Sequence, residues 1–168
     1  AIPVKDELDA LRLYLELESL RFKNKFTYSI TLDENIDANE DEIPPMLIQP
    51  YIENAILHGL MNKEVPDENN KPGHVTRLTP EKRTLVVEIK KKDGMIVCVV
   101  EDNGIGREKS KEINSAKKGK HISSGMSITK NRLEILNTLH QSNLSVNITD
   151  LKNGQEATGT RVEIFIPL

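Results

Sequence analysis

An amide and an imidazole interrupt an apolar stretch in the first half of the chain. Residues 44–60 read PPMLIQPYIENAILHGL, and Asn54 and His58 stand four positions apart within them. On a helix this spacing places both side chains on one face. Because buried polar groups need partners, the two form either a satisfied polar patch or one wall of a site for a polar ligand. An Asn oxygen is a hard, neutral ligand that suits Mg²⁺, which in turn bridges to phosphate oxygens.

A carboxylate followed by two glycines forms a second candidate element. In VVEDNGIGRE (99–108), Asp102 ends an apolar run, and Gly104 and Gly106 follow it. A carboxylate at the end of a buried strand can accept a hydrogen bond from an exocyclic amine, and glycines let the backbone approach a ligand closely. The same residues are also typical of a simple turn.

A glycine between serines forms the third candidate element. SSGMS (123–127) lies where helical spacing resumes over 124–140, and Ser124 is a candidate N-cap. Free N–H groups at a helix N-terminus favour phosphate, although an ordinary Ser-Gly cap has the same sequence.

Hydrophobic periodicity predicts the elements that must position these residues. Helices are expected over 4–22, within 44–60 and over 124–140; strands are expected at 26–32, twice within 84–102, at 144–151 and at 160–168. Such an order predicts an α+β fold, a mostly antiparallel sheet with helices on one face.

The segments between these elements have their own signals. An Asp-Gly pair at 93–94 predicts a hairpin turn, and KNGQEATG (152–159) is expected to separate the last two strands. Pro50 indicates that the second helix starts near Met46 or kinks in its first turns. Residues 61–83 are a polar insertion, and residues 104–124 lack periodicity and are expected to be flexible.

The first helix carries two apolar stripes. One contains Leu8, Leu11, Leu15 and Phe22, and the other contains Leu13, Leu17 and Leu20. Either both stripes are buried within the domain, or the second packs against another element or chain.

Composition excludes several classes of protein. The chain has 168 residues, a formal net charge of −3 and 4% aromatic residues, so it lacks the basic, aromatic surface of a nucleic-acid-binding protein. Its single cysteine, Cys98, cannot form an intramolecular disulfide and is expected to be an inert buried thiol. No apolar run is long enough to span a membrane. Because the chain begins AIPVKDELDA without Met, we expect a fragment of a longer protein.

The three elements together are more specific than any one of them. Their order resembles the nucleotide-binding boxes of the gyrase, heat-shock chaperone, histidine kinase and MutL ATPase superfamily, and within it the catalytic domain of LytS/YehU-type sensor histidine kinases. IPPMLIQPYIENAILHG looks like the N box, VEDNGIG the first glycine box, SSGMSITKNRLEIL the second, and GTRVEIFIPL the terminal strand. The resemblance implies a Bergerat-type two-layer α/β sandwich over 25–168, preceded by a helix at 1–24 that leads from a dimerisation and phosphoacceptor region.

The resemblance also implies roles for individual residues in binding ATP and Mg²⁺. Asn54 would ligate Mg²⁺ on the ATP phosphates, and His58 would line the pocket. Asp102 would read the adenine amino group with support from Thr160, while Gly104 and Gly106 would pass close to the nucleotide.

The phosphates would meet the second glycine box. Gly125 and the amides of Met126 and Ser127 would contact them at the helix start. Residues 107–123 would form the ATP lid, whose lysines would be mostly solvated (Lys109, Lys111, Lys117, Lys118 and Lys120).

The chain departs from the family pattern at three positions, two of which (Leu57 and Ser123) motivate an alternative, a degenerate domain that regulates by binding partners. Leu57 stands where a lysine is common, Ser123 where a glycine is expected, and Ile128 where many relatives have Asn. These departures put phosphate affinity and turnover in doubt.

Pro50 argues against a free-standing ATPase or anti-sigma serine kinase. Members of those classes place a Glu general base one turn before the Mg²⁺ Asn, and Pro50 stands there instead. The adjacent Glu53 lies about 100° round the helix and is expected to be a rim or structural residue. Histidine kinases need no such base, because the acceptor imidazole is itself the nucleophile.

The acceptor histidine is expected outside this chain. The four histidines are His58, His74, His121 and His140, and none lies on a helix preceding the domain. The resemblance therefore implies phosphoryl transfer to an upstream histidine of a homodimeric, membrane-anchored bacterial sensor, with the domain in the cytoplasm and a response regulator as partner.

Overall fold

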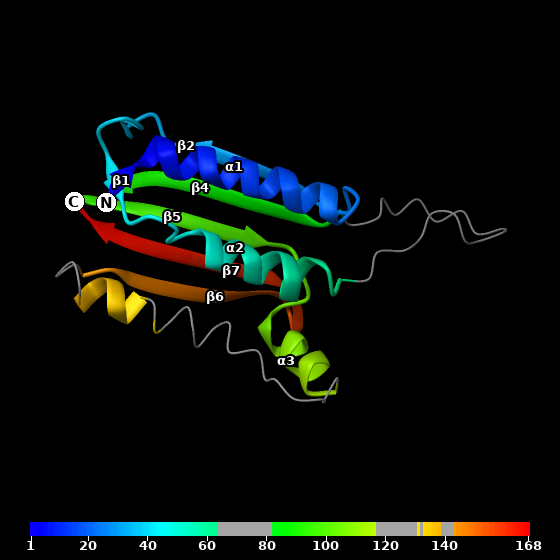
Figure 1. The fold of residues 1–168 in the computed structure, drawn as a ribbon. Coiled ribbons are helices and arrows are strands. Elements are labelled where there is room, and N and C mark those ends of the chain that lie inside the picture. The colour runs from blue at the N-terminus through cyan, green and yellow to red at the C-terminus, as the bar shows by residue number, and fades with distance from the viewer. Residues whose placement is uncertain (64–81, 117–130, 132, 139–142) are drawn as a thin grey trace.

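A five-stranded mixed sheet forms the body of the protein. The computed structural model describes residues 1–63, 82–116, 131, 133–138 and 143–168. The strands are β2 (Thr27–Leu32), β4 (Thr84–Lys92), β5 (Met95–Asp102), β6 (Ser145–Asn153) and β7 (Glu156–Pro167), in the order β2-β4-β5-β7-β6. β2 pairs in parallel with β4, and the remaining neighbours are antiparallel. The predicted α+β class and mostly antiparallel sheet are confirmed (Figure 1).

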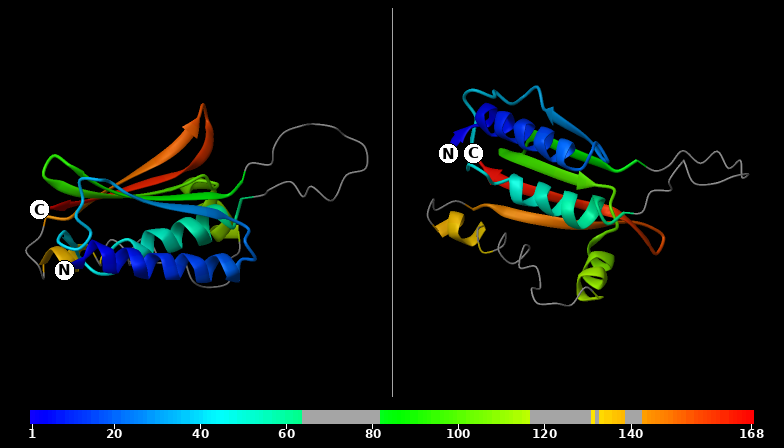
Figure 2. Two further views of the ribbon diagram at one scale, coloured as in Figure 1. Left: turned by 90° about the horizontal axis from the view of Figure 1, so that it is seen from above. Right: turned by 45° about the vertical axis from the view of Figure 1, so that its right-hand side comes forward.

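The described helices lie on one face of this sheet. Figure 2 shows them as a single layer against one side of the strands, while the other side carries no helix. The core between the layers includes Leu85, Ile89 and Ile96 from the sheet and Ile52 and Ile56 from a helix, all of them 0–1% exposed. Cys98 also lies in this core, where burial raises the pKa of its thiol, in agreement with the predicted inert cysteine.

Two tight turns connect the antiparallel strands. Asp93 and Gly94 join β4 to β5 with φ of 51° and 74°, as the Asp-Gly pair predicts. Between β6 and β7, the expected eight-residue connection is wrong. Pairing continues to Asn153 and Glu156, so the turn is only two residues long and Gly154 takes φ of 63°. The pairing register shifts between Leu151, which lies opposite Gly159, and Lys152, which lies opposite Ala157, so β7 has one extra residue at this point.

The first helix, α1 (Val4–Arg21), buries one of its two stripes. Leu8, Leu11 and Leu15 are at most 2% exposed and pack on the sheet. In the second stripe, Leu13, Leu17 and Leu20 are 59%, 57% and 63% exposed. The described residues therefore leave the second stripe on the surface.

The polar-interrupted helix starts later than expected and changes its geometry midway. α2 (Gln49–Asn54) begins three residues after Met46, which instead occupies a turn with φ of 54°. Pro50 falls in the first turn of α2, where its missing N–H costs nothing. The helix continues as a π-helix, η1 (Ala55–Leu60), a geometry that often occurs at functional sites.

A small second sheet ties the start of α1 to the segment before α2. β1 (Ile2–Pro3) and β3 (Glu42–Ile43) pair antiparallel, and neither was predicted from the sequence because each has only two residues. The buried carboxylate of Glu7 accepts a hydrogen bond from the Met46 N–H at 2.9 Å. Together these contacts fix the approach to α2.

The segment after the first glycine box is helical, contrary to the expectation of a flexible region from residue 104. α3 (Arg107–Ala116) is rich in Glu and Lys, which are good helix formers that need no apolar stripe. Of the predicted helix at 124–140, residues 131 and 133–138 are described and helical, and Leu133 and Leu136 pack against the core. Ser124 lies outside the described residues.

Charged side chains cover the face of the sheet that carries no described helix. Val97 and Val99 point to this face yet are 2% and 1% exposed. Glu88 and Glu163 flank Val99 on the neighbouring strands, and Arg161 pairs with Glu163 at 3.4 Å. The aliphatic parts of such side chains cover apolar surface while the charges stay in water.

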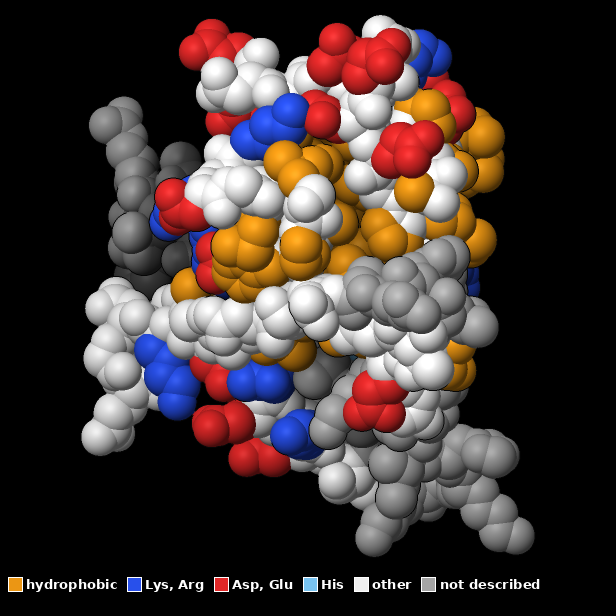
Figure 3. All heavy atoms as spheres, turned by 90° about the vertical axis from the view of Figure 1, so that its left-hand side faces the viewer, with side chains coloured by type: hydrophobic (Ala, Val, Ile, Leu, Met, Phe, Trp, Pro, Cys, Tyr) orange, Lys and Arg blue, Asp and Glu red, His pale blue; other side chains and the backbone are white. Residues whose placement is uncertain are grey.

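Hydrophobic side chains also gather on the surface at the end of the molecule that carries both termini (Figure 3). The exposed hydrophobic residues include Met46 and Leu168, at 49% and 67%. Among the described helices, none combines the length and hydrophobicity that a membrane crossing requires.

Candidate functional site

Asp102 is a buried carboxylate at the end of β5. It is 5% exposed, and its Oδ1 accepts a hydrogen bond from the Gly104 N–H at 2.8 Å. Burial raises the pKa of Asp102 to about 6, and the Gly104 hydrogen bond opposes that rise. A carboxylate in this environment strongly favours a ligand that donates a hydrogen bond to it.

Glycines bring the N-box helix against this carboxylate. A Cβ on Gly59 would lie 2.7 Å from Asp102 Oδ1, and a Cβ on Gly104 would lie 2.5 Å from the Gly59 Cα. The Ile105 N–H also donates to the Gly59 carbonyl at 3.3 Å. The end of η1 and the first glycine box therefore meet backbone to backbone, which only glycines at both positions permit.

Asn54 is the last residue of α2, directly before the π-helix η1 that carries Gly59. It is half-buried, and its side-chain nitrogen is buried without a hydrogen-bond partner among the described residues. An amide nitrogen donates, so this group gains from a ligand that offers an acceptor atom. The neighbouring Glu53 accepts a hydrogen bond from Gln49 at 3.0 Å, in keeping with a structural role, and His58 is half-buried on η1.

The first half of β7 completes the surroundings of Asp102. Thr160 is the cross-strand partner of Asp102, so both side chains point to the helical face of the sheet. Gly159 precedes it with φ of 150°, and a Cβ there would overlap the Asp102 carbonyl. Asp150 is the partner of Thr160 on β6, and it pairs with Arg107 at the start of α3.

The second glycine of the first box adopts a conformation that other residues rarely take. Gly106 has φ of 80°, and a Cβ there would lie 2.9 Å from the Ala157 Cβ. Lys109 and Lys111 of the expected lid are exposed on α3. The predicted phosphate-binding residues lie outside the described part of the chain, as do other positions discussed above (Gly125, Met126, Ser127, Lys117, Lys118, Lys120, His74, His121, His140, Ser123 and Ile128).

The described residues do not hold a metal ion by themselves. Within them, no three His, Cys, Asp or Glu side chains are grouped so as to bind one. The unpartnered Asn54 nitrogen is a donor and cannot ligate a cation, so a metal ion at this site would be held by the Asn54 oxygen together with ligand oxygens and water.

Several residues of this region were not recognised from the sequence. Gly59 and Gly159 were missed because their role depends on contacts between segments distant in sequence. The Arg107–Asp150 pair also joins residues far apart, and no spacing rule predicts it. For Gly59, the one available signal in the sequence was its position next to His58 in the N box.

Known proteins similar to this chain include sensor kinases. It is 34% identical over 107 residues to the sensor protein LytS of Oceanobacillus iheyensis, which covers 64% of this chain and 15% of that protein. It is 41% identical over 59 residues to the sensor histidine kinase YpdA of Escherichia coli, covering 35% of this chain and 10% of that protein. The chain thus spans only a small part of these relatives. No family model matches it.

The fold has a counterpart among solved structures. The catalytic domain of histidine kinase ThkA superimposes with a TM-score of 0.55 at 11% identity, covering 99% of this chain and 94% of that one. This likeness establishes the fold, and the sequence relatives connect it to sensor kinases. The chain belongs to the catalytic domains of the sensor histidine kinases, with relatives of the LytS and YpdA kind.

Proposed function

We propose that this domain binds Mg-ATP in the site around Asp102 and supplies the γ-phosphoryl group to a histidine outside the chain. Asp102 accepts a hydrogen bond from the adenine amino group, and Thr160 supports it. Asn54 holds Mg²⁺ on the phosphates with His58 nearby, and the glycines of both boxes let the backbone approach the nucleotide.

One observation carries the proposal. A carboxylate that is 5% exposed lies against backbone at Gly59 and Gly104, and the helix that contains Gly59 carries the Asn54 amide, whose nitrogen is buried and has no partner among the described residues. Asp102 gains from a ligand that offers a hydrogen-bond donor, and the Asn54 nitrogen gains from a ligand that offers an acceptor such as a phosphate oxygen. The Asn54 oxygen can then ligate Mg²⁺ on the same phosphates. Adenine nucleotides with Mg²⁺ offer both.

The reaction needs positioning and charge neutralisation more than acid–base chemistry. The bond from the γ-phosphorus to the bridging oxygen of ADP breaks as an imidazole nitrogen bonds to phosphorus. Mg²⁺, when bound, neutralises charge on the phosphate oxygens. Pro50 occupies the position one turn before Asn54 and offers no base for water. The chain is therefore suited to a protein nucleophile.

The remaining assignments follow from this activity. The acceptor lies on helices upstream that also form a homodimer, and a response regulator takes the phosphoryl group. The domain lies in the cytoplasm of a bacterium, as part of a membrane-anchored sensor. Residues 107–123 act as its ATP lid, and Gly125, Met126 and Ser127 meet the phosphates.

Isothermal titration with ADP and Mg²⁺ tests the proposal. Saturable binding is expected, and Asn54→Ala and Asp102→Ala should each weaken it by at least about tenfold, a loss of about 1.4 kcal/mol. Asn39→Ala, on an exposed loop, is the control and should bind as the unaltered chain does. Absence of binding at millimolar ADP, or binding indifferent to both site substitutions, would refute the proposal.

A degenerate, partner-binding domain is the second candidate. Leu57, 41% exposed on η1, motivates it because a lysine is common at this position in the family that the chain resembles. If the domain is catalytic, the longer protein with its upstream helices acquires acid-labile phosphate from ATP. If it is degenerate, that protein acquires none, and Leu57→Lys strengthens ADP binding.

A further inference from the structure

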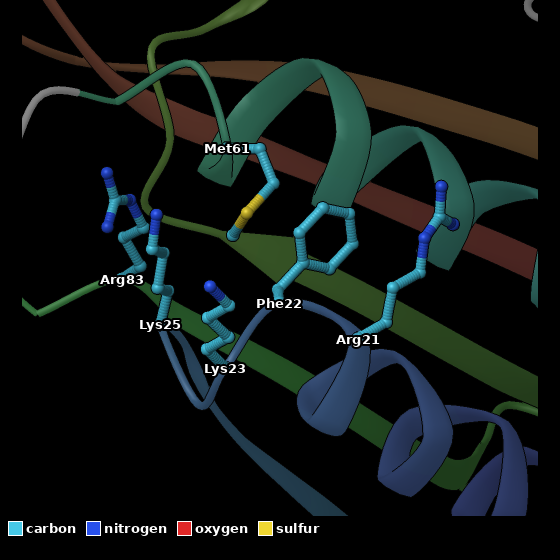
Figure 4. A pocket seen from close by; sticks show the side chains of 6 residues that line it. All are labelled: Arg21, Phe22, Lys23, Lys25, Met61 and Arg83. Atoms are coloured by element: carbon cyan, nitrogen blue, oxygen red, sulfur yellow. The ribbon is translucent and has the colours of Figure 1, made fainter.

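A basic hollow lies beside the N-box helix, on the side away from α3. It has a volume of about 320 Å³ and is lined by six residues: Arg21, Phe22, Lys23, Lys25, Met61 and Arg83. Figure 4 shows Phe22 and Met61 side by side at its floor, with the amino groups of Lys23 and Lys25 and the guanidinium of Arg83 on the same side of them. The hollow thus combines an apolar floor with a cationic wall, and none of the described residues that line it is acidic.

Two of the four cations have no counter-ion among the described residues. Arg21 pairs with Glu18 at 3.4 Å and lies 5.1 Å from the centre of the Phe22 ring. In contrast, neither Lys23 nor Lys25 forms an ion pair with any described residue, and both are exposed. In a chain whose net charge is −3, two such lysines beside two arginines concentrate positive charge locally.

The turn that presents these lysines adopts a costly conformation. Lys23 and Asn24 have φ of 54° and 56°; this conformation is unfavourable by about 1–2 kcal/mol for Lys23, whereas Asn tolerates it. Ser19 holds the turn, because its Oγ donates to Asn24 Oδ1 at 3.0 Å and its carbonyl accepts the Asn24 N–H at 2.8 Å. Together with the bond from the Lys23 N–H to the Leu20 carbonyl, these contacts form a regular helix end, which fixes where the two lysines leave the helix.

Hydrogen bonds connect the hollow to the loop that follows Asp102. The Arg83 guanidinium donates to the Lys63 carbonyl, and Lys63 Nζ donates to the Asn103 carbonyl at 2.9 Å. Asn103 Oδ1 in turn accepts the Thr84 N–H at 2.8 Å. A ligand that draws Arg83 into the hollow therefore pulls on the residue between Asp102 and Gly104.

We propose that this hollow binds a small organic oxyanion and that the Asp102 loop senses its occupancy through Arg83 and Lys63. The cationic wall selects a carboxylate or a phosphate monoester, and Phe22 and Met61 select an apolar group attached to it. The volume lies at the lower end of the range for small-molecule sites, about 300–1,000 Å³, which suits a ligand with a single ring. The site is separate from the proposed nucleotide site, on the other side of η1.

Two-dimensional NMR of the 168-residue chain without nucleotide tests the binding. Phenyl phosphate, benzoate and inorganic phosphate are titrated separately. Saturable shifts of the amides of 23–25 are expected with phenyl phosphate or benzoate, and the tighter of the two identifies the oxyanion. Lys23→Gln with Lys25→Gln should weaken binding by about tenfold or more, because each removed cation loses a charge-assisted hydrogen bond. Lys92→Gln, an exposed lysine at the far end of β4, is the control.

The same spectra test the connection to the loop. The amides of Asn103 and Gly104 should shift with the organic anion, and Lys63→Met, which removes the bond to Asn103 but does not line the hollow, should abolish these shifts and leave binding intact. The binding site is refuted if inorganic phosphate binds as tightly as the organic anions, or if the double lysine variant binds as the unaltered chain does. The connection is refuted if Lys63→Met leaves the loop shifts unchanged. Since nucleotide is absent, neither result depends on the proposed kinase function.

Discussion

Arg107 and Asp150 form a two-pronged ion pair that joins the first residue of α3 to β6. Arg107 Nε lies 2.7 Å from Asp150 Oδ1, and Arg107 Nη2 lies 2.8 Å from Asp150 Oδ2. Arg107 directly follows Gly106, so the pair fixes the direction in which the chain leaves the first glycine box. It thereby connects the wall of the proposed adenine site to the edge of the sheet.

Arg107→Ala is expected to lower the free energy of unfolding by about 1 kcal/mol, because a two-pronged Arg–carboxylate pair stabilises a protein more than an ordinary surface ion pair does. The hydrogen bond from Arg107 lowers the pKa of Asp150 below 3.8. The stabilisation is therefore present above that pH and is lost as the pH falls through the lowered pKa. Urea unfolding of Arg107→Ala and of Glu108→Gln measures it. Glu108 contacts Lys152 only at 3.8 Å and is the control, so equal effects of the two substitutions would contradict the prediction.

Asp102→Asn is expected to stabilise the domain at alkaline pH while weakening ADP binding. Burial raises the pKa of Asp102 from 3.8 to about 6, so its ionised form costs stability above pH 6. The cost is relieved as the pH falls from 6 towards 3.8. Because Asn is neutral and its Oδ1 can still accept the Gly104 N–H, the variant should gain about 1–3 kcal/mol near pH 8 and about half as much near pH 5. Urea unfolding at both pH values checks this, and a gain that does not change with pH would contradict it.

Gly104→Ala is expected to be strongly destabilising, by about 3 kcal/mol or more, because the added methyl group overlaps backbone that cannot move aside. The new Cβ would lie 2.5 Å from the Gly59 Cα. Gly154→Asn is the control, because that turn has open space and Asn tolerates its φ of 63°. Thermal unfolding separates the two; a melting temperature for Gly104→Ala close to that of the control would show that the two backbones can part.

The two faces of α1 are expected to respond differently to the same substitution. Leu11 is 1% exposed and Leu13 is 59% exposed. Leu11→Ala should cost about 2–5 kcal/mol, whereas Leu13→Ala should stay within about 0.5 kcal/mol of the unaltered chain. Chemical unfolding measures both. A large loss for Leu13→Ala would mean that the exposed stripe is covered in solution.

The sequence was most informative where local chemistry decides the structure. Asp93 and Gly94 specify their turn by themselves, and the leucine spacing specifies both stripes of α1. The sequence was less informative where contacts between distant segments determine the extent of an element. The β6–β7 strands extend beyond their apolar residues because backbone pairing with the sheet continues through Lys152 and Ala157, and α3 forms without the apolar spacing that marks most helices.

For the candidate site, the sequence predicted the participants but not their contacts. Asp102 and Thr160 do lie opposite each other on adjacent strands, and Asn54 does lie on the helix beside them. The tight approach of Gly59 to Asp102 could not be predicted, because it depends on how a π-helix packs against a strand end. The roles of these residues in binding nucleotide stay predictions.

The parallel pairing of β2 with β4 has a consequence for the order of folding. β4 and β5, like β6 and β7, are joined by two-residue turns, whereas β2 must find β4 across residues 33–83. Closing so long a loop costs more entropy than closing a hairpin, so the β4–β5 and β6–β7 hairpins should each form before β2 docks onto β4, together with α1. The domain is thus expected to open from its N-terminal end, with amide hydrogens of β2 exchanging faster than those of β5.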